Sequence, residues 1–146
     1  LWNGTMNKAL ILLTALFLSA CGSNPTRPNY DQFVMEHDLK QVSRVQQFRF
    51  TGWQPLDSGY LILLSTHNRA YLLELMSPCN DLPFTQQIAL KQTSRTSLVA
   101  KFDKVLVQDQ MPESCTIDKI YELTEEQHDE IADYAGGHIK DTKVVD

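Results

Sequence analysis

The sequence predicts a mainly β (α+β) fold, namely a small antiparallel β-barrel or rolled sheet of about six strands with a short helix at each end. Two nearly continuous apolar runs, residues 60–66 and 70–76, are separated only by His67-Asn68-Arg69. This pattern predicts a central hairpin that is covered on both faces. Alternation with a period of two surrounds the hairpin, whereas helical spacing is confined to the two ends of the domain.

A single β-rich domain is predicted over residues 30–135, with one helix at each end. Residues 30–45 place apolar side chains on helical spacing, with Asp31 as a cap of the first turn, and predict one helix that packs against the sheet. The second helix opens after Thr124, whose spacing from Gln127 is typical of a capping box. It ends before two consecutive glycines.

The other strands are predicted between turn-forming segments. Residues 98–109 are the longest strand candidate, and residues 115–123 form a last strand in which a bulge or bend breaks strict alternation. Asn68 suits the positive φ of the hairpin turn and leaves His67 exposed at its tip. Shorter strands are predicted at residues 48–53 and 87–93.

The N-terminus has the features of a lipoprotein signal peptide. Lys8 precedes an uncharged apolar run, residues 9–18, which is shorter than the roughly 20 residues of a membrane-spanning helix. Leu18-Ser19-Ala20-Cys21 resembles a bacterial lipobox. The resemblance implies a diacylglyceryl group, with palmitate-type acyl chains, on the Cys21 sulfur and cleavage before this residue. We therefore interpret residues 1–20 as upstream sequence and signal peptide.

The segments outside the domain predict a tethered protein. Residues 21–29 contain Gly, Ser, Asn and two Pro and are interpreted as a flexible linker, and residues 136–146 as a polar tail. Gly22 rather than Asp follows Cys21. By resemblance to enterobacterial sorting, this favours an outer-membrane lipoprotein that faces the periplasm and contacts the membrane through its lipid anchor.

Cys79 and Cys115 remain as a pair once Cys21 carries a lipid. In an oxidising compartment such a pair predicts one structural disulfide. A metal site is disfavoured because no further cysteine lies at ligand spacing, and a redox-active pair because the two are far apart in sequence. We predict no metal and no cofactor. The formal net charge of −5 argues against a nucleic-acid partner, which requires a clustered basic surface.

Few residues carry a chemical signal. The chain has no GxSxG, HExxH or phosphate-binding glycine motif, so we predict no enzymatic activity and no catalytic residue. Trp53, Asp57 and Asp103 are selected as a ligand or partner surface. The alternatives are that the aspartates bond backbone amides and that Trp53 belongs to the core. His37 lies between Glu36 and Asp38 and is interpreted as part of a solvated face.

The hairpin and its flanking segments resemble a known family. The elements that carry the resemblance, besides the hairpin, are Gly52-Trp53, Leu56-Asp57, Pro78-Cys79-Asn80-Asp81-Leu82, Phe102-Asp103-Lys104-Val105 and Cys115-Thr116-Ile117. Over residues 48–123 the chain is similar to an uncharacterised family of proteobacterial envelope proteins of the DUF6491 type. The resemblance implies this fold and an envelope location, and it implies no activity. Many relatives carry a second cysteine pair that this sequence lacks.

These observations favour a lipid-anchored envelope protein that acts as a non-catalytic binding or accessory module for another envelope protein. A first alternative is an inhibitor of a lytic enzyme, because Ser58-Gly59-Tyr60 is similar to the Ser-Gly loop of lysozyme inhibitors. A second alternative is a hydrolase of envelope polymers, in which Asp57 and Asp103 would share one pocket.

Overall fold

The computed structural model describes residues 28–134. In chain order its elements are α2 (Tyr30–Glu36), β1 (Lys40–Val42), β2 (Arg44–Gln46), β3 (Phe50–Pro55), β4 (Tyr60–Ser65), β5 (Arg69–Leu75), β6 (Ile88–Lys91), β7 (Ser97–Val99), β8 (Lys104–Val107), β9 (Glu113–Leu123) and α3 (Glu125–Tyr134). The predicted lipobox with Cys21, the linker up to residue 27 and the tail predicted for residues 136–146 lie outside the described residues. No helix in the described part is long and apolar enough to cross a membrane.

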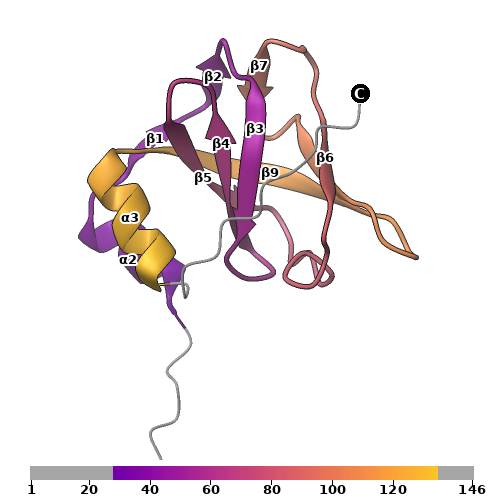
Figure 1. The fold of residues 1–146 in the computed structure, drawn as a ribbon, viewed down its shortest axis with the longest axis horizontal. Coiled ribbons are helices and arrows are strands. Elements are labelled where there is room, and N and C mark those ends of the chain that lie inside the picture. The colour runs from indigo at the N-terminus through magenta and orange to yellow at the C-terminus, as the bar shows by residue number, and fades with distance from the viewer. Residues whose placement is uncertain (1–27, 135–146) are drawn as a thin grey trace, which may run out of the picture.

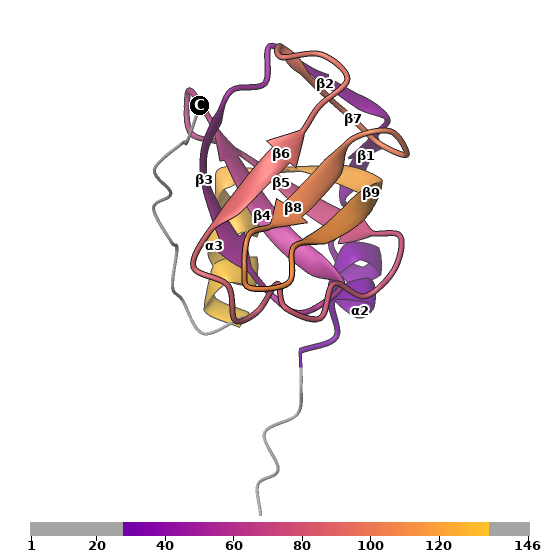
Figure 2. The same cartoon turned by 90° about the vertical axis from the view of Figure 1, so that its right-hand side faces the viewer.

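Antiparallel strands in the order β3-β4-β5-β9-β8-β6 curl into a half-barrel (Figures 1 and 2). β9 uses both of its edges: β5 pairs along one edge, and β8 and then β1 pair along the other. β2 and β7 form a separate two-stranded ribbon. The predicted fold class is confirmed, since the domain is mainly antiparallel β with one short helix near each end.

The central hairpin β4–β5 is buried on both faces, as predicted. Successive side chains of a strand point to opposite faces of the sheet. Leu61 and Leu63 therefore enter the main core inside the curl, whereas Ile62 enters a second apolar cluster on the outer face. Helices α2 and α3 cover this outer face and contribute Phe33 and Ile131 to the second cluster. The helices thus bury the side of the sheet that would otherwise face solvent.

Three local sequence signals are confirmed. His67 and Asn68 adopt φ values of 63° and 54° in the β4–β5 turn. The register between β5 and β9 shifts at Asp118, which is the predicted bulge. The Thr124 N–H donates to Gln127 Oε1 at 3.0 Å, and the Gln127 N–H donates to Thr124 Oγ1 at 3.2 Å. This reciprocal pair is the predicted capping box at the start of α3.

The helix predicted over residues 30–45 is wrong beyond Glu36. Asp38 adopts a φ of 45°, a left-handed conformation that ends a right-handed helix, and the Leu39 N–H bonds back to the Val34 carbonyl at 3.2 Å. The chain then extends into β1 and β2, which find partners in β9 and β7. Pairing with strands distant in sequence has overridden the local helical spacing.

The single strand predicted over residues 98–109 is also wrong. β7 ends at Val99 and β8 begins at Lys104, and Lys101 between them has a φ of 71°. The Asp103 carboxylate accepts the Val99 N–H at 2.7 Å and closes this turn. The two short strands then pair with different partners, β2 and β6.

The predicted disulfide between Cys79 and Cys115 is confirmed. The two Cα atoms lie 6.0 Å apart, and both residues are buried. The bond joins the loop after β5 to the start of β9, 36 positions later in the sequence. Glu113 lies close to both sulfur atoms, but sulfur atoms that are bonded to each other are not thiolate ligands for a metal.

The strand order defines two ends of the half-barrel. The β3–β4 turn, residues 76–87 and the β8–β9 hairpin meet at one end, which we call the disulfide end. Residues 47–49, the β4–β5 turn and residues 92–96 meet at the opposite end, which we call the arginine end. The ribbon of β2 and β7 marks the arginine end at the top of both views (Figures 1 and 2). Pro28 lies at the disulfide end, where it lines a cavity with Asp57.

Candidate functional site

Trp53 does not belong to a ligand or partner surface. Its side chain is fully buried in the main core, together with Leu61 of β4 and Leu73 of β5. The prediction of an exposed stacking platform is therefore wrong, and the alternative interpretation as a core aromatic holds. The inward direction follows from the register, since Trp53 lies opposite Leu63 of β4, whose side chain also enters the main core.

Asp103 is fully buried, and the prediction that it forms part of a surface is wrong. One carboxylate oxygen accepts the backbone N–H of Thr93 at 2.8 Å and its hydroxyl at 2.7 Å. The other oxygen accepts the Val99 N–H at 2.7 Å. Charge-assisted hydrogen bonds of this kind compensate a carboxylate for its loss of water. Asp103 thereby fixes both ends of the loop that carries Arg95.

Asp57 lies at the disulfide end and is half-buried. Its Oδ1 accepts the backbone N–H groups of Gly59 at 2.7 Å and Tyr60 at 2.8 Å, which forms the β3–β4 turn. Asp57 also lines a cavity of about 470 Å³ together with Tyr30 and the exposed Phe84. Asp103 does not line this cavity, so the two aspartates share no pocket.

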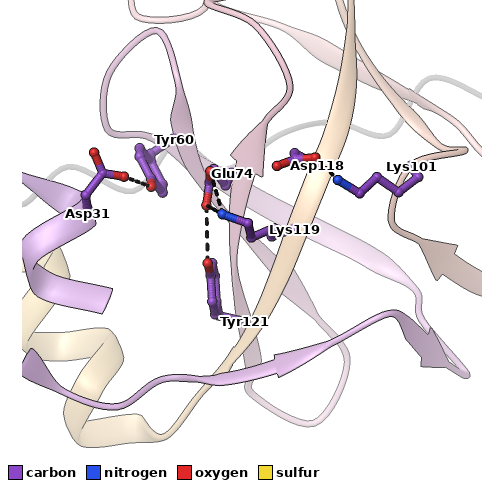
Figure 3. Close-up of polar contacts among 7 residues, drawn as sticks. All are labelled: Asp31, Tyr60, Glu74, Lys101, Asp118, Lys119 and Tyr121. Carbon is purple, nitrogen blue, oxygen red and sulfur yellow. Dashed lines mark hydrogen bonds and ion pairs between the residues drawn. The ribbon is translucent and has the colours of Figure 1, made fainter. Parts of the chain in front are cut away.

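A polar network fastens α2 and β9 to the hairpin (Figure 3). The Tyr60 hydroxyl donates to the Asp31 carboxylate of α2. Burial, and then this hydrogen bond, raise the pKa of Tyr60 above its ordinary value. Glu74 accepts from Lys119 Nζ at 3.0 Å and from the Tyr121 hydroxyl at 3.2 Å. The hydrogen bond to Glu74 raises the pKa of Lys119. Each of these groups is engaged in holding the elements together.

The prediction that His37 belongs to a solvated face is incomplete, because its ring is partly buried. Its ring stacks on Phe33 with centroids 3.9 Å apart, and its Nδ1 lies 3.0 Å from the Phe33 carbonyl oxygen. Its Nε2 lies 2.9 Å from a carboxylate oxygen of Glu130 in α3. His37 therefore links the two helices, which the sequence neighbours Glu36 and Asp38 did not indicate.

A different group of side chains lines a pocket at the arginine end. The pocket has a volume of about 500 Å³ and is lined by Gln47, Phe48, Arg49, Thr66, His67, Arg69, Arg95 and Thr96. Three of the four arginines among the described residues line it, and none of its lining residues is Asp or Glu. We call it the arginine pocket. In a chain with a formal net charge of −5, this is a local concentration of positive charge.

The three arginines differ in their contacts. Arg69 is held in place, because its Nε donates to the Thr66 carbonyl at 3.4 Å and its Nη2 donates to the Gln47 carbonyl at 3.2 Å. Arg49 and Arg95 are exposed, and within residues 28–134 their guanidinium groups form no hydrogen bond or ion pair. The ion pairs within residues 28–134 join carboxylates to lysines and to His37 instead. Within residues 28–134, two guanidinium groups of the pocket thus have no protein partner that would compete with a ligand.

The backbone around the arginine pocket is preorganised. The Phe48 N–H donates to the Thr96 carbonyl at 3.0 Å, and the Arg49 N–H donates to Ser65 Oγ at 3.0 Å. Together with the bonds of Asp103 described above, these contacts fix the backbone positions of the pocket-lining segments. The sequence did not reveal this site, because Arg49, Arg69 and Arg95 come from three separate segments. The available signal was that each arginine lies within or next to a predicted turn or strand end.

The comparisons with known proteins identify the family and nothing further. No curated protein and no solved structure matches the chain. A family model described as "Family of unknown function (DUF6491)" matches residues 5–137. The match covers nearly the whole chain and confirms the resemblance found in the sequence. The chain belongs to the DUF6491 family, whose function is unknown.

Proposed function

We propose that this chain is a lipid-anchored protein of the cell envelope that acts as a non-catalytic binding module. The observation that carries the binding role is the arginine pocket, which Arg49, Arg69 and Arg95 line without an Asp or Glu among the described lining residues. Arg69 is held by two backbone carbonyls, and the guanidinium groups of Arg49 and Arg95 are unpaired within residues 28–134. Such a cavity favours an anionic group presented by another envelope component.

The position of the pocket agrees with a tethered module. Pro28 enters the domain at the disulfide end, and the arginine pocket opens at the other end. If Cys21 is lipidated, the predicted linker connects the anchor to the end of the domain farther from the pocket. The pocket would then face away from the membrane, towards components that the anchored protein can reach.

The alternative functions receive no support from the side chains selected for them. Tyr60 of the Ser58-Gly59-Tyr60 loop is buried and bonded to Asp31, so it is not available for insertion into a lytic enzyme. Asp57 and Asp103 share no cavity, and both accept backbone amides, so they do not form an acid/base pair.

In-cell crosslinking of the tagged full-length protein, followed by purification and mass spectrometry, tests the binding role. Arg49→Glu combined with Arg95→Glu should abolish crosslinking to a saturable partner, because the pocket would lose its available positive charges. Arg44→Glu is the matched control, since Arg44 is exposed on the neighbouring β2 and does not line the pocket. A partner captured equally by all variants would exclude the arginine pocket as the binding site.

Cell fractionation tests the anchor separately. Cys21→Ala should move the protein from the membrane fraction to the soluble fraction, because the thiol that would accept the lipid is absent. The wild-type protein should also incorporate a labelled palmitate analogue, whereas Cys21→Ala should not. Retention of Cys21→Ala in the membrane fraction would show that the anchor assignment is wrong.

A further inference from the structure

We propose that the group bound in the arginine pocket is a phosphate, carried by a polar ligand such as a phosphorylated sugar. This proposal rests on the binding role proposed above and specifies its ligand chemistry. The arginine pocket is the region of the described chain where arginine residues from three segments line one cavity. A planar guanidinium with several N–H donors matches the oxygen atoms of phosphate in a bidentate geometry.

The number of donors favours phosphate over a carboxylate. A carboxylate has two oxygen atoms and one charge, which a single arginine can satisfy through two parallel hydrogen bonds. A phosphate monoester has three terminal oxygen atoms and roughly −1.5 to −2 charges at neutral pH. Arg49, Arg69 and Arg95 provide guanidinium groups from three segments, and the imidazole of His67 and the hydroxyl of Thr66 add further donors. This set exceeds what a carboxylate requires and suits a tetrahedral dianion.

The pocket also has room for more than the phosphate itself. Its volume of about 500 Å³ is within the range of small-molecule sites. Among the other lining residues, Gln47 and Thr96 are exposed and offer an amide and a hydroxyl, whereas Phe48 is almost completely buried. A hydroxylated carrier that exchanges hydrogen bonds with an amide and a hydroxyl fits this lining better than an acyl chain or an aromatic ring.

Arg69 on one side and Arg49 and Arg95 on the other have different roles in binding the phosphate. Arg69 is fixed by two backbone carbonyls, so part of the positive charge is in position before a ligand arrives. Arg49 and Arg95 have no such contacts among the described residues and can close on the bound oxygen atoms. Fixing two long side chains on binding costs conformational entropy, which the charge-assisted hydrogen bonds must exceed.

Isothermal titration calorimetry on the detergent-solubilised full chain, at low ionic strength, tests the ligand class. The probes are inorganic phosphate, glucose 6-phosphate and acetate. We expect saturable binding of phosphate, tighter binding of glucose 6-phosphate, and acetate binding that is weaker than phosphate by roughly tenfold or more. Arg49→Gln and Arg95→Gln should each weaken phosphate binding by roughly tenfold, whereas Arg44→Gln should leave it unchanged.

The outcomes separate this proposal from the binding role itself. Equal affinity for phosphate and acetate would overturn the phosphate assignment, and so would phosphate binding that Arg49→Gln and Arg95→Gln leave intact. If phosphate fails to bind while crosslinking to a partner still depends on Arg49 and Arg95, the binding role stands and the phosphate proposal falls. If glucose 6-phosphate binds no more tightly than inorganic phosphate, the assignment of a phosphate group is supported and the assignment of a sugar as its carrier is overturned.

Discussion

The two ends of the half-barrel use their charged side chains in different ways. At the disulfide end, the carboxylates of Asp57 and Glu113 accept backbone N–H groups of the loops, and the disulfide fixes the same region covalently. At the arginine end, the guanidinium groups of Arg49 and Arg95 form no hydrogen bond or ion pair with a described residue. The carboxylates at the disulfide end thus hold the fold together, whereas two of the three arginines that line the pocket are unpaired within the described residues.

This difference indicates where stability and binding can be separated. Carboxylates that already accept backbone N–H groups are unsuited to ligand binding, because a carboxylate that turned to a ligand would leave these donors without an acceptor. Charged groups without partners contribute little to the free energy of folding, so a binding role explains their position better than a role in stability. Variants at the two ends should therefore change different measured quantities, and the following predictions run from the largest expected effect to the smallest.

Asp103→Ala should produce the largest loss of stability. The substitution leaves the Thr93 N–H, the Thr93 hydroxyl and the Val99 N–H without their acceptor. The cost is roughly 1–3 kcal/mol for each unsatisfied group, and water can partly replace the acceptor at the exposed Thr93, so the free energy of unfolding should fall by about 3–6 kcal/mol. Urea denaturation monitored by circular dichroism measures the loss. Asp103→Asn, which keeps a carbonyl oxygen, should lose less. An Asp103→Ala variant with the free energy of unfolding of the wild type would contradict the role assigned to this carboxylate.

Removal of the disulfide should have the next largest effect. Cys79→Ser opens a loop spanned by 36 positions, which in the chain-entropy model lowers the free energy of unfolding by roughly 3–4 kcal/mol. Thermal melting under oxidising conditions should show the difference from wild type. The difference should shrink markedly in a reducing agent, because the wild type then also lacks the bond. If oxidised wild type and variant melt together, the disulfide does not constrain the chain in solution.

Much of the fold was predictable because its signals are local. The apolar runs of β4 and β5 report burial on both faces, Asn68 reports a positive φ, and the pair Thr124 and Gln127 reports a helix start. Each depends on residues within a few positions of one another, so no partner strand has to be known. The cysteine pair was predictable for a different reason, since only two cysteines remained once Cys21 was set aside.

Apart from the local turn that Asp103 closes on Val99, the errors and omissions involve contacts between distant segments. Residues 40–42 and 44–46 form strands because they pair with β9 and β7, and no local sequence pattern encodes these distant partners. Trp53 and Asp103 were assigned to a surface because burial depends on what packs over a residue. The arginine pocket combines positions 49, 69 and 95, and only the closed sheet brings them together. Binding sites assembled in this way are hidden from a reading along the chain.

Alkaline pH should destabilise the domain through Tyr30, near the disulfide end. Burial, then the charge of Asp57, and then Tyr134 raise the pKa of Tyr30 from its ordinary value of 10.0 to about 12. Because the folded state favours the neutral phenol, its contribution is complete below pH 10 and is lost as the pH rises from about 10 to 12. A shift of this size corresponds to roughly 2–3 kcal/mol.

Near-ultraviolet absorbance, which reports tyrosinate, measures this titration during a pH-dependent unfolding series. Tyr30→Phe is the control, since it retains the ring and cannot ionise. The variant should lose less stability than wild type between pH 10 and 12. The pKa of Tyr60 is also raised, so the Tyr30→Phe domain should still unfold at higher pH. Identical pH profiles for both proteins would show that Tyr30 ionises freely in the fold.

Arg49→Gln combined with Arg95→Gln should have the smallest effect on stability. Exposed side chains without partners usually change the free energy of unfolding by less than about 0.5 kcal/mol, and removal of neighbouring like charges can even stabilise the domain. Arg69→Gln is the informative contrast, because it removes two hydrogen bonds to backbone carbonyls and should lower stability by roughly 1–2 kcal/mol. Parallel urea titrations would compare the three proteins. A double variant as unstable as Arg69→Gln would mean that all three guanidinium groups serve the fold, and the contrast between the two ends would disappear.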